Sequence, residues 1–290
     1  MEKTFDTPGR VRLYVENEVG LVAITTRPTR ATVVTLEAET PGAEELVERA
    51  AVECRPAGGG HVVAVKIRHL HGMRFLRRNA VTVRVELPEG SDVTVATGSA
   101  DVEVVVPVGA ADFKTASGDV STDDIEAGVV AKTASGDVAL GRVGGDLRVA
   151  TASGALRCSS VAGTAVFTTV SGDLEVGEAG DAVEVKATSG NVRLGEVAHG
   201  ARVVNVSGDV RVLAIGEGSV KVRSVSGDVS VGVAEGVDLH VDVETMSGSV
   251  RSDIPLEDEP PARRGGARVD VTVRSVSGDI AIERATETAA

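Results

Sequence analysis

The chain has 290 residues and a mass of 29.6 kDa; 42% of the residues are apolar, 25% are charged and 2% are aromatic. This composition is typical of a folded, soluble protein and excludes disorder as a general description. The net charge of −13 argues against nucleic-acid binding, because contact with phosphates requires a basic surface.

The sequence also limits where in the cell we expect the protein and which cofactors we expect it to bind. No apolar run approaches the roughly 20 residues that cross a bilayer, so we expect no membrane span. The first ten residues lack the basic start and apolar centre of a secretory signal, which predicts a cytoplasmic protein. Cys54 and Cys158 lie far apart and have no metal-ligand spacing. We therefore expect two reduced, buried thiols, no metal and no cofactor.

Residues 1–24 are predicted to form the first coil of a repeat, because residues 9–24 alternate between apolar and polar over two short stretches. Residues 25–80 change pattern and are predicted to form a β-rich insertion. Within it, residues 41–51 favour a short helix with Pro41 in its first turn, and residues 61–68 favour a strand. The alternating pattern then returns at Val81.

A basic segment follows the predicted strand of the insertion. It consists of two histidines among five cations: Lys66, Arg68, His69, His71, Arg74, Arg77 and Arg78. Such a segment could contact an anionic partner, and the His-x-His pair could share a metal, although no third ligand is identifiable. We favour a solvated hairpin, with possible interaction of these seven residues with a partner as the functional alternative.

From Gly118 onward the sequence repeats. Segments of 18 residues, here called rows, come first and are followed by longer rows. The equal rows follow one another without a gap and begin at Gly118, Gly136, Gly154, Gly172 and Gly190. The dipeptide Ser-Gly marks the rows at Ser117, Ser135, Ser153, Ser171, Ser189, Ser207, Ser226, Ser247 and Ser277. Each row contains two short alternating stretches, which is typical of two strands per coil. In the first, Val120, Val138 and Leu156 share one inward column.

This period of about 18 residues predicts an all-β fold, a parallel β-solenoid over residues 81–290 with coils stacked about 4.8 Å apart. Residues 255–267 are rich in charge and proline and are predicted to form a loop insertion. A single coil cannot offset its ordering cost of roughly 27 kcal/mol, so neighbouring coils must stabilise one another. The end coils then need covers, because exposed edges recruit other chains.

The turns form a predicted ladder of Ser, Gly and Asp. It consists of Ser117, Gly118, Asp119, Ser135, Gly136, Asp137, Ser171, Gly172, Asp173, Ser207, Gly208, Asp209, Ser226, Gly227, Asp228, Ser277, Gly278 and Asp279. Stacked carboxylates could bind calcium. However, Ala155, Asn191 and Ser249 interrupt the column, so we favour a structural role in which the carboxylates accept backbone N–H bonds at the turns.

A file of threonines precedes the turns at Thr115, Thr133, Thr151 and Thr169. A flat outward array of threonines could order water or bind ice. These positions instead follow the inward columns by two residues, which predicts hydroxyls that bond the backbone or each other near the turn.

The recurring S-G-D-[VIL] pattern, as in SGDV at Ser117, Ser135, Ser207 and Ser226, and the start TFDTPGRVRLYVENEVGLVAI carry a family resemblance. The chain resembles the bacterial proposed-adhesin repeat proteins of domain of unknown function 4097 over nearly its whole length. The resemblance implies a β-repeat fold and an adhesin-like binding surface. It brings no catalytic residues.

No motif of nucleophilic, metal-dependent or dinucleotide-dependent catalysis is present. We therefore predict a non-enzymatic scaffold or interaction protein that binds an unknown protein or glycan, does not bind nucleic acid and is a monomer. The alternative is a carbohydrate-active β-helix enzyme that cleaves polysaccharides. An acidic cluster beside a groove would favour the enzyme, whereas smooth faces would favour binding.

Overall fold

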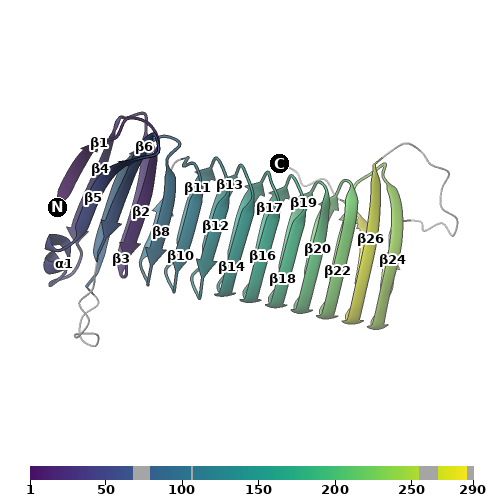
Figure 1. The fold of residues 1–290 in the computed structure, drawn as a ribbon. Helices are drawn as coiled ribbons and strands as arrows, with labels where there is room; N and C mark the ends of the chain where they lie inside the picture. Colours follow the sequence, from purple (N-terminus) through teal and green to yellow (C-terminus); the bar gives the residue numbers. More distant parts are fainter. Residues whose placement is uncertain (68–78, 106, 255–266, 286–290) are drawn as a thin grey trace. The chain divides into compact units, whose positions relative to one another are not determined.

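The computed structural model describes residues 1–67, 79–105, 107–254 and 267–285. The chain divides into two compact units, Met1–Gly145 and Asp146–Ala290, and each is described by itself. In both units, strands from successive coils line up in parallel to form two sheets (Figure 1). This arrangement confirms the predicted all-β solenoid with two short strands per coil.

The first unit contains two sheets and the helix α1 (Glu44–Glu48). One sheet has, in spatial order, β1 (Glu2–Asp6), β4 (Ala31–Ala38), β7 (Val81–Pro88), β3 (Gly20–Arg27), β9 (Asp101–Val104), β11 (Val120–Ile125) and β13 (Val138–Val143). The other has β5 (Ala51–Ala57), β6 (Gly60–Lys66), β2 (Val11–Asn17), β8 (Asp92–Thr97), β10 (Ala111–Thr115) and β12 (Val129–Thr133). The pairs β1–β4, β4–β7 and β5–β6 are antiparallel.

The second unit also contains two sheets, and its strand pairs are parallel. One sheet has β15 (Leu156–Val161), β17 (Leu174–Ala179), β19 (Val192–Val197), β21 (Val210–Ile215), β23 (Val229–Val233), β27 (Ile280–Arg284) and β25 (Val250–Ser252). The other has β14 (Leu147–Ser153), β16 (Ala165–Ser171), β18 (Val183–Ser189), β20 (Gly200–Ser207), β22 (Gly218–Ser226), β26 (Arg268–Ser277) and β24 (Asp238–Ser247).

The core consists of the inward columns of both sheets. Val192 and Leu194 in β19 are buried, whereas Arg193 between them is exposed. On the neighbouring strands β16 and β18, the buried residues Phe167 and Val185 lie in register. A strand turns alternate side chains to opposite faces, so the period of two within a strand and the regular repeat between coils place one apolar layer above another.

The threonine file lies inside, as its parity predicts. The hydroxyl oxygens of Thr115 and Thr133 each accept a bond from the backbone N–H of the turn glycine three residues on, at 2.9 Å. Thr151 donates to the carbonyl of Ser153 at 2.9 Å. Where Asn205 replaces threonine, its amide donates to the carbonyl of Gly208 at 2.8 Å. These members of the file therefore satisfy backbone groups at the turns, whereas the buried hydroxyl of Thr169 has no hydrogen-bond partner among the described residues.

The order of the coils in space differs from their order in the sequence at two places. In the first unit, the coil β2/β3 lies between β6/β7 and β8/β9. In the second, β26/β27 lies between β22/β23 and β24/β25, as Figure 1 shows for β22, β26 and β24. Both strands of each inserted coil thus have a hydrogen-bonding partner on either side, which a coil at the edge of its sheets lacks.

The N-terminal part of the first unit departs from the sequence prediction in two respects. Residues 60–66, which the sequence assigns to an insertion over residues 25–80, pair in parallel with β2 and so belong to the solenoid ladder. The helix predicted over residues 41–51 is restricted to Glu44–Glu48, since Gly42 has a φ of +96° and no side chain caps the helix. The helix buries Leu46 and Val47.

Candidate interaction surface

The basic segment predicted from the sequence falls mostly outside the described residues, which include Lys66 but not Arg68, His69, His71, Arg74, Arg77 or Arg78. Lys66 lies at the end of β6, where its ammonium group is 3.2 Å from the carboxylate of Glu16 on the neighbouring strand β2. Interaction of this segment with a partner stays a prediction.

The turn aspartates form a ladder of bonds between coils. One carboxylate oxygen accepts a hydrogen bond from the backbone N–H of the equivalent residue one coil away, as Asp119 does from Asp137 and Asp209 does from Asp228, both at 2.9 Å. Asn191 takes the same place with its amide oxygen, accepting from Asp209 at 3.0 Å. The acceptor, rather than the charge, is therefore the feature that the turn requires.

Ala155 offers no side-chain acceptor at its place in this ladder. Replacing Ala155 with asparagine places an amide oxygen where Asn191 has one, within reach of the Asp173 N–H. We expect the variant to gain about 1 kcal/mol of unfolding free energy, the usual net value of one hydrogen bond. Urea unfolding measures the change. Ala155→Leu is the control, because it adds bulk without an acceptor; an equal gain in both variants would contradict the explanation.

The ladder also predicts a response to acid at Asp279. The Ser249 N–H donates to the Asp279 carboxylate at 2.8 Å, and this bond holds the pKa of Asp279 below its ordinary value. Because the pKa is lower in the folded state than in the unfolded state, the contribution to stability is present above the ordinary aspartate pKa and is lost as the pH falls through the folded one.

We expect the Ser249 amide resonance in NMR spectra to titrate with a midpoint below that of an ordinary aspartate. Asp279→Asn keeps the acceptor oxygen and should abolish the titration. A midpoint at or above the ordinary value would show that the bond does not favour the carboxylate.

A second group of polar residues lies on the side of the sheet β14–β24 that faces away from the core, here called the outer face. Register aligns its side chains in columns that run across the strands. One column contains Arg148, Val166, Glu184, Arg202, Lys221, Thr272 and Asp242. The next contains Ala150, Thr168, Lys186, Val204, Arg223, Arg274 and Glu244.

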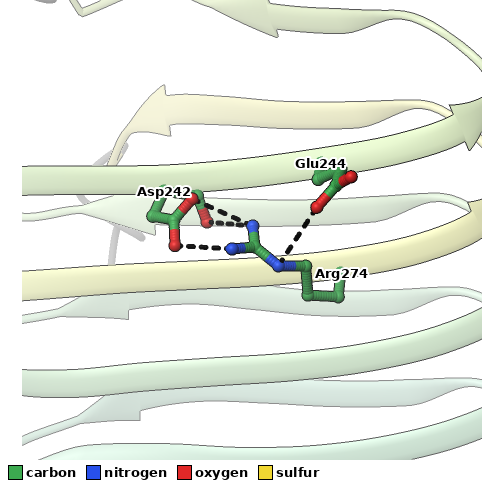
Figure 2. Close-up of polar contacts among 3 residues, drawn as sticks. All are labelled: Asp242, Glu244 and Arg274. Atoms are coloured by element: carbon green, nitrogen blue, oxygen red, sulfur yellow. Dashed lines mark hydrogen bonds and ion pairs between the residues drawn. The ribbon is translucent and has the colours of Figure 1, made fainter.

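Arg274 is held by two carboxylates of the neighbouring strand β24, as Figure 2 shows. Its two terminal nitrogens donate to the two oxygens of Asp242 at 2.9 and 2.7 Å, and its Nε lies 3.5 Å from Glu244. The hydrogen bond from Arg274 holds the pKa of Asp242 below its ordinary value, and Asp242 raises the pKa of Arg274. The charge of Arg274 is therefore compensated within the sheet.

Three other cations on the outer face, Arg202, Lys221 and Arg223, form what we call the cation cluster. None makes a hydrogen bond or an ion pair with any residue that the structure describes. They are exposed and line a hollow of about 240 Å³ together with Val204, Thr272 and Arg274. A nearby carboxylate, Glu184, is bonded to Lys186 at 2.8 Å, which is the main reason that its pKa is lowered.

An exposed row of apolar side chains runs beside these columns. This apolar row consists of Val206, Val225, Val276 and Met246, which are 44%, 48%, 46% and 80% exposed. Register places them on four successive strands, β20, β22, β26 and β24. Isolated exposed valines are common on proteins, but contiguous apolar side chains mark surfaces that bind other molecules.

A larger hollow of about 820 Å³ follows the ends of the strands in the other sheet of the second unit. Small residues line it together with Glu178, Glu196 and Glu235.

Among the described residues, no three histidine, cysteine or acidic side chains come together as a metal site. Burial raises the pKa of the Cys158 thiol to about 12, so this cysteine stays protonated and a poor nucleophile.

The family of the chain follows from its sequence. A family model described as Toastrack DUF4097 matches residues 59–283. The chain belongs to this family. The matched residues of this Toastrack protein include the outer face, with both the cation cluster and the apolar row.

Solved structures similar to this Toastrack protein share little sequence with it. One is a proposed cell adhesion protein from Clostridium sporogenes, with 11% identity over 98% of this chain and 99% of that chain and a TM-score of 0.31. Proposed adhesins from Bacteroides fragilis and Parabacteroides distasonis have identities of 12% and 11% and TM-scores of 0.41 and 0.46. They cover 97% and 95% of this chain and 96% of each of those chains. No curated protein matches the sequence.

Sequence reasoning missed the cation cluster. Of its three members, only Arg202 lies in the rows of equal length. Lys221 and Arg223 lie in a longer row, and only the register of the strands places Lys221 beside Arg202 and Arg274 beside Arg223. Extending the outward columns into the next row, from Gly208 to the residue before Gly227, could have found Lys221 and Arg223.

No helix in the described part of this Toastrack chain could span a membrane.

Proposed function

We propose that this Toastrack protein is a non-enzymatic, adhesin-like binding protein and that it binds a protein or glycan partner on the outer face of the sheet β14–β24. The observation that carries the proposal is the apolar row beside the cation cluster, aligned by register on adjacent strands. A flat sheet presents such side chains at regular spacing, which suits an extended contact. The larger hollow, with Glu178, Glu196 and Glu235 in its lining, meets the acidic-groove criterion of the polysaccharide-cleaving alternative, but none of the described residues that line it is aromatic and could stack on a sugar ring.

Immobilised glycans and extracellular matrix proteins test the proposal. The full chain should be retained by at least one component. The variant Val206→Thr/Val225→Thr/Val276→Thr should bind that component more weakly by about tenfold or more, because each substitution replaces one exposed methyl group by a hydroxyl of similar size. The control is Val105→Thr/Val130→Thr, the same substitution at outward positions of the first unit.

Equal loss in both variants, or retention of no component, would contradict the proposal. The release of new reducing ends from a bound polysaccharide would instead support the enzyme. Cytoplasmic residence stays a prediction, and fractionation of the source cell measures it.

A further inference from the structure

The cation cluster places like charges next to one another on adjacent strands. Arg202 faces Lys221 in register, and Arg223 faces Arg274. Strands lie about 4.8 Å apart, and like charges directly opposite each other destabilise a sheet. Asp242 and Glu244 compensate Arg274, but no described residue forms an ion pair with the three members of the cluster. Glu184 lies in register with Arg202 but is bonded to Lys186, so the outer face carries positive charge that the sheet neutralises only in part.

The chain contains enough acid to neutralise these cations, since it has 43 aspartates and glutamates against 30 lysines and arginines. Cross-strand ion pairs occur elsewhere, as between Arg193 and Glu175 at 3.6 Å on the other sheet of the same unit. At the cluster, Val204 faces Arg223 and Thr272 faces Lys221, and the one carboxylate in register, Glu184 beside Arg202, is bonded to Lys186. One carboxylate that Lys186 already compensates thus faces three cations, so the shortfall of negative charge is a local property of this surface.

The hollow defines the size of a group that could supply that charge. Its volume of about 240 Å³ is smaller than the roughly 300–1,000 Å³ that encloses a drug-sized ligand. Four cations line it, and Val203, Val204, Val222 and Thr272 make up the rest of its lining. It suits one anionic unit of a longer molecule, with further units lying over the neighbouring strands. Guanidinium groups bind carboxylates and sulfates through paired hydrogen bonds.

The backbone around the hollow excludes a peptide that binds by adding a strand to the sheet. Strand β22 is paired with β20 on one side and with β26 on the other, so its edges cannot accept an added peptide strand. Recognition must then rely on the side chains. A linear polymer with an anionic group on each repeating unit can contact several cations at once, and linked contacts strengthen one another.

We infer that the cation cluster binds a linear polysaccharide that carries carboxylate or sulfate groups, with one charged sugar seated in the hollow among Arg202, Lys221 and Arg223. The inference rests on the proposed function and names the class of ligand for that surface. It assigns the positioning of the anionic groups to the cluster and leaves contact with the rest of the polymer to the apolar row.

Binding of the full chain to four soluble polymers at physiological ionic strength tests the inference. Heparin carries sulfates, polygalacturonate carries carboxylates alone, dextran is neutral and poly-glutamate is an acidic polypeptide. We expect binding to heparin, to polygalacturonate or to both, with the stronger of the two showing which anionic group is preferred. Binding to dextran should be absent, and binding to poly-glutamate should be at least about tenfold weaker.

The variant Arg202→Gln/Lys221→Gln/Arg223→Gln should lower the affinity for the bound glycan by about tenfold or more. Its matched control is Arg157→Gln/Arg193→Gln/Arg211→Gln, which removes the same charge from exposed outward positions of the other sheet and should change the affinity less than twofold. Urea unfolding of both variants and of the unsubstituted protein, with equal midpoints for all three, establishes that the fold is intact in both variants.

The inference is overturned if neither anionic glycan binds, if both variants lose affinity equally, or if poly-glutamate binds as tightly as the glycans. The failure of the proposed function is distinguishable from these results. If the Val206→Thr/Val225→Thr/Val276→Thr variant still loses a partner while no anionic glycan binds, the surface is correct and the ligand class is wrong. If neither that variant nor the cation-cluster variant affects any binding, both proposals fail.

Discussion

Replacing Gly190 with alanine is expected to destabilise the second unit by about 3 kcal/mol or more, a loss reserved for substitutions that strain the backbone or the core. Gly190 has a φ of +130°, which side chains rarely adopt. A Cβ there would lie 2.2 Å from the carbonyl oxygen of Gly172 and 2.7 Å from its carbon. Both atoms belong to the backbone of the adjacent coil, which cannot move away from the added Cβ as a flexible side chain could.

The strain should spread because Gly190 takes part in the ladder. Its N–H donates to the Ser207 carbonyl at 3.1 Å, and the Gly172 N–H donates to the Ser189 carbonyl at the same distance. Moving the turn away from Gly172 weakens bonds to both neighbouring coils. The fall in unfolding free energy can be measured by urea denaturation followed by circular dichroism.

Gly216→Ala is the matched control in the same unit. Its φ lies outside the positive range, and the nearest atom to an added Cβ is the Ala198 carbonyl oxygen at 3.9 Å, an ordinary contact. We expect no loss, or a gain of about 0.4–1 kcal/mol from the stiffer unfolded chain. If Gly190→Ala were as harmless as this control, the close approach of the coils at the Ser-Gly turns would be refuted.

The sequence is sufficient to predict the coil and its inward columns, because both follow from periodicity. Val192 and Leu194 alternate with Arg193, and the same alternation recurs one coil later at Val210 and Val212. The alternation of residues along a strand decides which side chains face inward. The regular repeat length between coils decides which residue of the next coil lies beside each of them. Neither inference needs knowledge of the distances between coils.

Features that depend on pairing between distant segments could not be predicted in the same way. The turn aspartates accept hydrogen bonds from a neighbouring coil. The alternation of residues along a strand predicts which face a side chain lies on, but it does not predict the group to which that side chain bonds. The insertion of β26/β27 between β22/β23 and β24/β25 reverses the order that the rows suggest. Only the paired strands show that Arg274 of β26 meets Arg223 on one side and Glu244 on the other.

Phe167→Ala is expected to lower the unfolding free energy of the second unit by about 3–5 kcal/mol, the usual cost of removing a buried phenylalanine. Phe167 is 1% exposed and one of only four phenylalanines in the chain. Its neighbours in register are Val149 and Val185. Both are short β-branched residues on hydrogen-bonded strands, so they cannot move into the vacated volume without breaking the ladder.

Phe167→Leu is the control, since it keeps most of the volume and should cost less than about 1.5 kcal/mol. Urea denaturation of the three proteins measures both changes. A loss for Phe167→Ala no larger than that of the control would mean that the coils can close on the cavity. That result would contradict a stack whose spacing is fixed by hydrogen bonds along both sheets. A large loss restricted to alanine would instead show that a thin, valine-rich core depends on its few aromatic side chains for volume that neighbouring coils cannot replace.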